Sequence, residues 1–525
     1  MANRNSPQKS VMKHSFSDVP RADIPRSSFD RSHGYKTTFD AGYLIPCFVD
    51  EALPGDTFNL KMTAFARLAT PITPFMDNMR MDTQFFAVPI RLIWENWQKF
   101  NGEQQHPGDS TDFLIPQVTA PAGGYLSSSL SDYFGIPTGV DITTSSLWHR
   151  AYNLVYNEWY RDQNLQTSAN LEIDDGPDAP TWFFLQRRGK RPDYFTSALP
   201  WPQKGDSVDL PLGTSAPVVP FGPIPSFENI SSAQTGNLNW SASGDVAMGV
   251  AGAPAGLMGW NETGLVTDLS DATAATINQL RQAFQVQKML ERDARGGTRY
   301  TEIIKSHFGV SSPDARLQRP EYLGGGSSPI YINPVAQTQA SAATTDTPQA
   351  NLAAVGTVNI DNHGFTKSFT EHCILIGIVS VRADLTYQQG LNRMFSRQTR
   401  FDYYWPALSH IGEQAILMKE ILSQGTSDDE LVFGYQERFA EYRYKPSVIT
   451  GKFRSNDPQS LDYWHLSQEF ENLPVLGAEF IEENPPVDRV IAVTDEPHFL
   501  FDAYFSLRCA RPMPMFGTPG LIDHF

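Results

Sequence analysis

Hydrophobic and polar residues alternate over residues 498–509, close to the end of the chain. One parity of this segment is entirely apolar, and it contains Phe499, Phe501, Ala503, Phe505, Leu507 and Cys509. Because a strand turns successive side chains to opposite faces, the pattern predicts a strand with one buried face. Helical spacing would instead bring Asp502 and Arg508 among the phenylalanines. The strand comes last, so it must pair with segments from much earlier in the chain.

Similar patterns predict the other elements of a strand-rich fold. Strands are expected over 37–49, 56–66, 82–90, 365–385, 431–444 and 488–494. The run Cys373–Val381 is apolar on both parities, which predicts a strand that is covered on both faces.

Apolar residues recur every three or four positions in three further segments, so we expect helices there. These helices are expected from Pro89 to Phe100, over 147–160 and over 272–295, the last with Asp271 or Thr273 as its cap and a stripe of Ile277, Leu280, Ala283 and Phe284. In the second helix, His149 and Arg150 are predicted to lie on the side away from the core.

Composition supports many short strands joined by long loops. The chain has 525 residues, of which 40% are hydrophobic and 12% aromatic, with 38 glycines and 38 prolines. The three cysteines, Cys47, Cys373 and Cys509, lie in apolar runs and are expected to be buried free thiols. We expect a soluble chain without membrane insertion, because the N-terminus lacks a signal-peptide pattern and the longest apolar run is too short to span a bilayer.

Charge is distributed unevenly along the chain. The net charge of −17 excludes a general polyanion binder, so any contact with nucleic acid must be local. Residues 1–36 form a basic arm with seven Lys and Arg against three acids, and it is either a solvated tail or a contact to nucleic acid or another subunit. By contrast, 205–280 contains seven acids and neither Lys nor Arg, which predicts an outward-facing insertion.

Two clusters combine basic and aromatic residues. In the first, 181–204, the cations Arg187, Arg188, Lys190 and Arg191 stand among aromatic side chains. Cations can follow phosphates while rings stack on bases, which would suit single-stranded nucleic acid. The alternative is a charged turn between two half-buried strands. We favour this alternative slightly, because such turns are more common in proteins than nucleic-acid sites.

The second cluster covers 391–406. The arginines Arg393, Arg397 and Arg400 are predicted to share a helical face, and the aromatic residues Phe401, Tyr403, Tyr404 and Trp405 follow them. The arginines could bind phosphates while the aromatic rings stack on bases. They could equally pair with carboxylates across a subunit interface, where Arg, Tyr and Trp are enriched, and we favour this second interpretation.

The sequence contains none of the common catalytic or metal-binding motifs. The sequence has neither a nucleophile elbow nor a zinc-protease motif, and Pro446 stands where a phosphate-binding loop before Gly451 would need glycine. We therefore predict no catalytic residue, no metal site and no cofactor. Glu437 and Glu441 form only a nominal carboxylate pair for the alternative of a β-rich carbohydrate-active enzyme. A second alternative is a single-stranded-DNA-binding module.

The chain resembles the major capsid protein of gokushoviruses, which are small single-stranded DNA phages of the Microviridae. The resemblance rests on long runs in the same order, at 37–58, 85–104, 193–205, 384–396, 401–415, 434–447 and 508–525. It implies an eight-stranded antiparallel jelly roll with long loop insertions and a few helices. It also implies an icosahedral T=1 shell of about 60 copies around circular single-stranded DNA.

The resemblance implies a division of the chain into functional parts. A basic, partly disordered arm covers 1–36, the jelly roll covers 37–204 and 272–509, an acidic insertion that builds a three-fold protrusion covers 205–271, and an inter-subunit tail covers 510–525. Implied partners are further copies of the chain, the genome, a small internal DNA-binding protein, a pilot protein and a bacterial surface receptor reached by the protrusion. The protein is expected in the virion, after assembly in the host cytoplasm.

Three site predictions complete this interpretation. The four cations of 187–191 are predicted to face the genome. The tail, with Pro512, Pro514 and Phe516, is expected to run over a neighbouring subunit, because proline cannot continue a strand ladder. The second face of the last strand, with Asp502, Tyr504 and Arg508, is predicted to contact covering loops or the genome.

Overall fold

The structure, a computed structural model, describes residues 25–208, 277–338 and 352–517, together with the backbone of the short strands β8 to β14. It contains two compact units, one of Met1–Pro202 with Gly297–Phe525 and the other of Gln203–Gly296. Most of the predicted acidic insertion, including Asp271, therefore lies outside the residues whose side chains are described.

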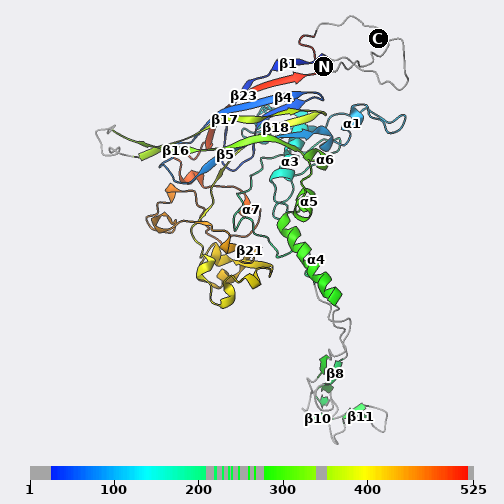
Figure 1. The fold of residues 1–525 in the computed structure, drawn as a ribbon, viewed down its shortest axis with the longest axis vertical. Coiled ribbons are helices and arrows are strands. Elements are labelled where there is room, and N and C mark those ends of the chain that lie inside the picture. The colour runs from blue at the N-terminus through cyan, green and yellow to red at the C-terminus, as the bar shows by residue number, and fades with distance from the viewer. Residues whose placement is uncertain are drawn as a thin grey trace, which may run out of the picture. The chain divides into compact units, whose positions relative to one another are not determined.

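The first large sheet holds the predicted final strand in its interior, with strands paired along both of its edges (Figure 1). Its antiparallel order is β1 (Ser27–Asp30), β23 (Phe499–Arg511), β4 (Thr57–Leu68), β17 (Leu352–Ser368) and β16 (Tyr331–Ala336), and β2 (His33–Phe39) also pairs with β23. The register places Phe505 opposite Met62, so the last strand pairs with a segment from much earlier in the chain, as predicted. Burial alternates along β23 as the sequence pattern predicts.

The second large sheet completes the architecture. Its order is β15 (Glu321–Pro329), β5 (Met79–Pro89), β18 (Cys373–Ala383) and β3 (Ile45–Ala52), again antiparallel. Strands β1 and β2 are successive pieces on one edge of β23, and β16 extends β17 as a hairpin. Two four-stranded sheets remain, β2-β23-β4-β17 and β3-β18-β5-β15, which is the eight-stranded jelly roll that the resemblance implies.

The main core lies between these two sheets. Aromatic rings from both sheets meet there, with the centroids of Phe48 and Phe505 5.3 Å apart and those of Phe85 and Phe365 5.6 Å apart. All three cysteines are buried free thiols, as predicted. Alternation therefore buries one face of each sheet.

Strand β18 is buried on both faces, which confirms the prediction for Cys373–Val381. One face contributes to the core between the sheets. The other packs Ile374 and Ile376 against a second cluster that includes Tyr152 of α3 (Leu147–Val155). The second sheet is thus covered by the long connection between β5 and β15.

Two long connections carry most of the remaining elements of the first unit. The connection from β5 to β15 includes α1 (Trp97–Phe100), β6 (Gln117–Thr119), α2 (Leu130–Tyr133), β7 (Thr143–Ser145), α3, α5 (Tyr300–Phe308) and α6 (Asp314–Leu317). The connection from β18 to β23 includes β19 (Thr386–Tyr387), β20 (Glu413–Leu417), β21 (Val432–Glu437), β22 (Ser447–Val448) and α7 (Ala478–Ile481). Among the described helices, none has the length and apolar character needed to cross a bilayer.

The second unit contains one long helix and several short strands. These are α4 (Ile277–Gly296), β8 (Val218–Pro220), β9 (Phe227–Asn229), β10 (Gln234–Gly236), β11 (Leu238–Trp240), β12 (Val246–Met248), β13 (Met258–Trp260) and β14 (Leu265–Thr267). The predicted helix is confirmed, but its stripe is largely exposed at Ile277 and Phe284. Both possible caps lie outside the described residues.

Several local predictions were wrong. His149 and Arg150 are each only 1% exposed. The segment 174–178 folds back over Arg150, and the rings of Phe134 and Phe183 pack against His149. The segment from Pro89 to Phe100 forms a 3-10 turn and the short helix α1, not one helix. A π-helical turn, Tyr156–Tyr160, follows α3.

Other predicted strands and helices are interrupted. The expected strand 37–49 divides into β2 and β3, and 488–494 begins as a 3-10 turn with one isolated bridge at Ile491. The strand expected over 431–444 ends at Glu437. In 391–406, short 3-10 turns replace the continuous helix that would have aligned the three arginines.

Candidate assembly and nucleic-acid surfaces

The basic residues of 187–191 contact the protein's own chain. The backbone of this segment forms isolated bridges, from Arg187 to Tyr43 and from Gly189 to Glu482, instead of regular strands. The Arg187 guanidinium donates to the Tyr43 hydroxyl at 2.9 Å and to the Glu483 carbonyl oxygen at 3.1 Å. The segment therefore joins the two long connections at one end of the second sheet.

Arg188 is buried in an ion cluster on the second sheet. Its guanidinium donates to Asp82 Oδ2 of β5 at 2.6 Å and to Ser380 Oγ of β18 at 2.7 Å. Arg382 donates to the same Asp82 oxygen at 2.9 Å. Burial opposes ionisation of Asp82, but the two arginines hold the pKa of its carboxyl below the ordinary value. In this subunit Arg188 is not displayed to a phosphate.

The other two cations of the segment are also paired. Lys190 Nζ donates to the Gln468 side chain at 2.7 Å and to the Phe480 carbonyl oxygen at 2.6 Å, and burial lowers its pKa to about 8. Arg191 donates to Asp384 at 2.8 Å. The structure thus brings all four predicted cations together as a clamp between the connections, and their role toward a genome remains a prediction.

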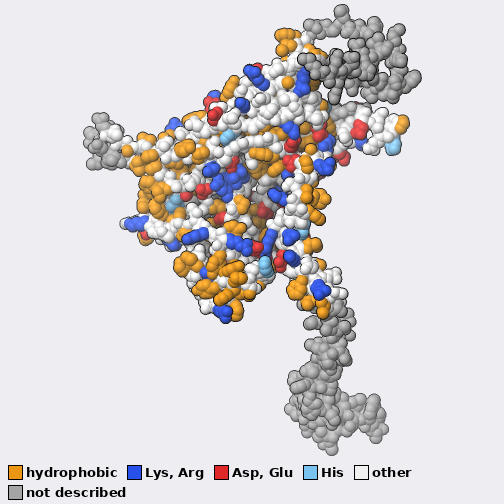
Figure 2. Space-filling model, viewed as in Figure 1, with side chains coloured by type: hydrophobic (Ala, Val, Ile, Leu, Met, Phe, Trp, Pro, Cys, Tyr) orange, Lys and Arg blue, Asp and Glu red, His pale blue; other side chains and the backbone are white. Residues whose placement is uncertain are grey.

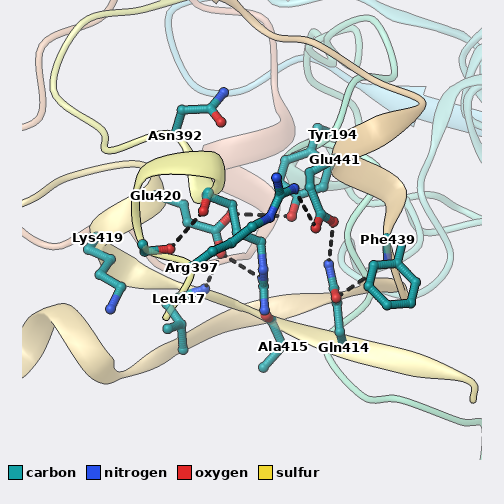
Figure 3. A network of polar contacts seen from close by, with 12 residues as sticks. Tyr194, Asn392, Arg397, Gln414, Ala415, Leu417, Lys419, Glu420, Phe439 and Glu441 are labelled. Carbon is teal, nitrogen blue, oxygen red and sulfur yellow. Dashed lines mark hydrogen bonds and ion pairs between the residues drawn. The ribbon is translucent and has the colours of Figure 1, made fainter. Parts of the chain in front are cut away.

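A second polar network holds the 391–406 cluster (Figure 3). Arg393 donates to Glu420 Oε1 at 2.9 Å and to the carbonyl oxygen of Ala415 at 2.7 Å, while the Tyr194 hydroxyl donates to Glu420 Oε2 at 3.2 Å. Burial raises the pKa of Glu420, and Arg393 opposes that rise. Arg393 is therefore used inside the subunit.

Arg397 and Arg400 differ in how far their side chains are exposed to solvent. Arg397 pairs with Glu441 at 3.4 Å and lies 4.3 Å from the ring centre of Tyr442. The guanidinium of Arg400 lies 4.6 Å from the ring centre of Trp405, in an exposed position. Of the three arginines, Arg400 is the one displayed at the surface.

The aromatic residues of this cluster are open to solvent. Phe401 is 63% exposed and Trp405 is 42% exposed, and Tyr403 and Tyr404 are exposed to similar degrees. Figure 2 shows hydrophobic side chains gathered beside Lys and Arg over the region of β21. Exposed aromatics next to arginine are the composition of a protein interface. Their use in subunit contacts stays a prediction.

The described start of the C-terminal tail is also exposed. Strand β23 ends at Arg511, and the chain continues through Pro512 and Pro514 without joining a strand. Phe516 is 83% exposed. An exposed apolar tail fits the predicted contact with a neighbouring subunit.

The outer face of the first sheet carries a third group of residues. On β23 this face contains Tyr504 and Arg508, which the sequence pattern identified. On β4 it contains Lys61, Phe65 and Arg67, which reasoning from the sequence missed. The alternation of β4 predicts which residues point outward, but only the register with β23 shows that these residues are neighbours.

The described residues contain no group of three or more His, Cys, Asp or Glu side chains arranged to hold a metal ion. A jelly roll with long insertions, exposed aromatic clusters and an open sheet face defines a protein built for contacts between macromolecules. Fold and surface together indicate the class of jelly-roll shell proteins.

Comparison with known proteins identifies the family. The family described as "Capsid protein (F protein)" matches residues 17–521. Three relatives named "Capsid protein VP1" are similar over nearly their whole length. That of Bdellovibrio phage phiMH2K is 50% identical, with 98% of each chain covered, and that of Chlamydia phage 1 is 45% identical, with 98% of each covered. That of Spiroplasma virus 4 is 38% identical, with 97% of each covered.

The chain therefore belongs to this family of phage capsid proteins. It is a structural major capsid protein of a Microviridae-type bacteriophage and not an enzyme. Self-assembly into a shell and a place in the virion follow from the family.

Proposed function

We propose that about 60 copies of this chain close into a T=1 icosahedral shell around circular single-stranded DNA. The observation that carries this proposal is the exposed cluster of Phe401, Tyr403, Tyr404 and Trp405 on a jelly-roll subunit. Such rings lose water favourably when a second copy covers them. Because a closed shell needs several different contact surfaces, the exposed tail with Phe516 is proposed as a second one.

An assembly experiment tests this contact. We compare the unaltered chain with Phe401→Ser combined with Trp405→Ser, using Phe308→Ser on α5 as a control that also removes an exposed aromatic ring. The double variant should remain folded but form few particles in sedimentation and electron microscopy, and the control should assemble normally. Equal assembly of all three chains would contradict the proposed interface.

The acidic insertion 205–271 is proposed to form a protrusion used in host attachment, supported by its composition and by its placement in a separate compact unit. Deleting about 210–268 should preserve particle formation and reduce adsorption to the host. Failure of assembly would show instead that the insertion is needed for folding.

Further partners are proposed on the same basis. Assembly is placed in the host bacterial cytoplasm, with a small internal DNA-binding protein, a pilot protein and a bacterial surface receptor as contacts. The composition of the basic arm 1–36 supports a contact with the genome or an acidic partner, because the arm is net positive whereas the chain as a whole is net negative. Mass spectrometry of purified particles should detect the small DNA-binding protein and the pilot protein and give the copy number of each.

A further inference from the structure

We propose that the outer face of the first sheet, along β4 and β23, binds single-stranded DNA by stacking bases on Phe65 and Tyr504 between basic side chains. This inference rests on the proposed function, because it identifies which face of the subunit contacts the enclosed genome. The second sheet cannot serve this purpose, since the long connection with α3 covers its outer face.

The register places the apolar residues of this face together. Phe65 lies opposite Asp502, and Leu500 and Tyr504 flank Asp502 on the same face of β23. The three apolar side chains are about half exposed: Leu500 at 56%, Phe65 at 47% and Tyr504 at 55%. Adjacent strands lie roughly 4.8 Å apart and same-face residues of one strand roughly 6.8 Å apart, so the two rings are diagonal neighbours.

Basic residues surround this apolar group. On β4 the outward residues include Lys61, Phe65 and Arg67, so cations stand on both sides of the ring. Arg508 adds a third cation on β23. Within the described part of the chain, these three cations form no ion pair.

Acids on the face are fewer and partly neutralised. Asp502 is the outward acid of β23, and it already pairs with Lys36 of β2 at 2.9 Å. Asp30 of β1 lies opposite Arg508, and Asp361 lies in the bulge of β17 beside Thr63 of β4. The face therefore carries four outward cations, Lys36, Lys61, Arg67 and Arg508, against three acids, on a chain whose net charge is −17.

A nucleic-acid ligand fits this combination better than a protein surface does. Exposed aromatic residues on a sheet can stack bases, and cations beside them can follow the phosphates. The described chain begins at residue 25, and its basic arm enters the fold through β1 at the edge of this same sheet. The sequence of this arm is basic overall, and a basic segment adds to polyanion binding.

Binding of a fluorescently labelled thymidine oligonucleotide to the full chain tests the proposal. Replacing Phe65 and Tyr504 by threonine keeps residues that favour strands, and each lost stacking contact should weaken binding roughly 5- to 150-fold. Because stacking carries no charge, the dependence of affinity on salt should stay unchanged in this variant.

A charge variant isolates the phosphate contacts. Replacing Lys61, Arg67 and Arg508 by glutamine should lower the slope of log affinity against log salt by about 2. The matched control replaces three exposed cations elsewhere, Lys305, Arg316 and Lys452, and should keep the slope of the unaltered chain.

Two results would overturn the inference. One is that both variants bind the oligonucleotide as the unaltered chain does while circular dichroism shows them folded. The other is normal binding with loss of particles, which would make this face a contact between copies. If the unaltered chain forms no particles at all, the proposed function fails, and the oligonucleotide measurement still decides whether this face binds DNA.

Discussion

Removing the charge of Asp82 separates a structural role of Arg188 from a role in DNA binding. Asp82 accepts from Arg188 at 2.6 Å and from Arg382 at 2.9 Å, and its side chain is 9% exposed. Asp82→Asn keeps the volume but leaves two mostly buried guanidinium groups facing a neutral amide. Breaking a buried pair in this way costs about 3–5 kcal/mol, because one charge loses its compensation.

The assay is urea unfolding of the unassembled subunit, followed by tryptophan fluorescence. The slope of the free energy against urea should not change, since the unfolded chain exposes the same surface. Arg188→Met in the Asp82→Asn background should restore part of the loss, giving a coupling of about 0.5–3 kcal/mol. The ion cluster would not stabilise the subunit as proposed if Asp82→Asn lowered the free energy of unfolding by less than about 1 kcal/mol and its effect were additive with that of Arg188→Met.

Three further predictions concern burial. Phe505→Ala should lower the free energy of unfolding by about 3–5 kcal/mol, because it leaves a cavity beside Phe48, whereas the exposed Leu500→Ala should cost under about 0.5 kcal/mol; equal costs would contradict the assigned faces of β23. Burial lowers the pKa of His149 from 6.5 to about 4, so between these pH values the unfolded chain binds the extra proton. The free energy of unfolding should fall by up to ~3 kcal/mol as pH drops through this window, and His149→Gln should remove that fall. Burial lowers the pKa of Lys190 from 10.5 to about 8, so the free energy of unfolding should rise with pH across that window by up to ~3 kcal/mol. Lys190→Met should remove this rise, and an unchanged pH profile in either variant would contradict the corresponding burial.

Local alternation made the jelly-roll strands predictable. The pattern of 498–509 identifies β23 because the two faces of that strand differ from each other in polarity over nearly its whole length. The two-sided burial of β18 was predictable for the same reason, since an apolar run has no face left for solvent. Pairing partners and strand order required the resemblance to a family.

The candidate sites depended on contacts that local sequence cannot show. Arg188 looks like a free cation in its own segment, but its partner Asp82 lies 106 positions away. Arg150 was placed on the solvent side of its helix, whereas Asp178 folds back to pair with it at 2.6 Å. A helical stripe predicts the face of an isolated helix and does not reveal a loop that covers the opposite face.

The outer face of the first sheet shows a further limit of prediction from the sequence, because its residues come from two strands far apart in the chain. Tyr504 and Arg508 were identified from β23 alone, because they lie on its outward-facing parity. Phe65 becomes informative only when the register places it beside them. Surfaces built across strands therefore require the sheet topology, while each contributing strand can be predicted from its own pattern.

Electron cryomicroscopy of particles formed by the unaltered chain shows whether the chain assembles as proposed. We expect a closed icosahedral shell with one jelly-roll chain per repeating unit, and with Phe401 and Trp405 covered by a neighbouring copy. Only monomers or small open oligomers under every assembly condition, including extracts of infected cells, would contradict it.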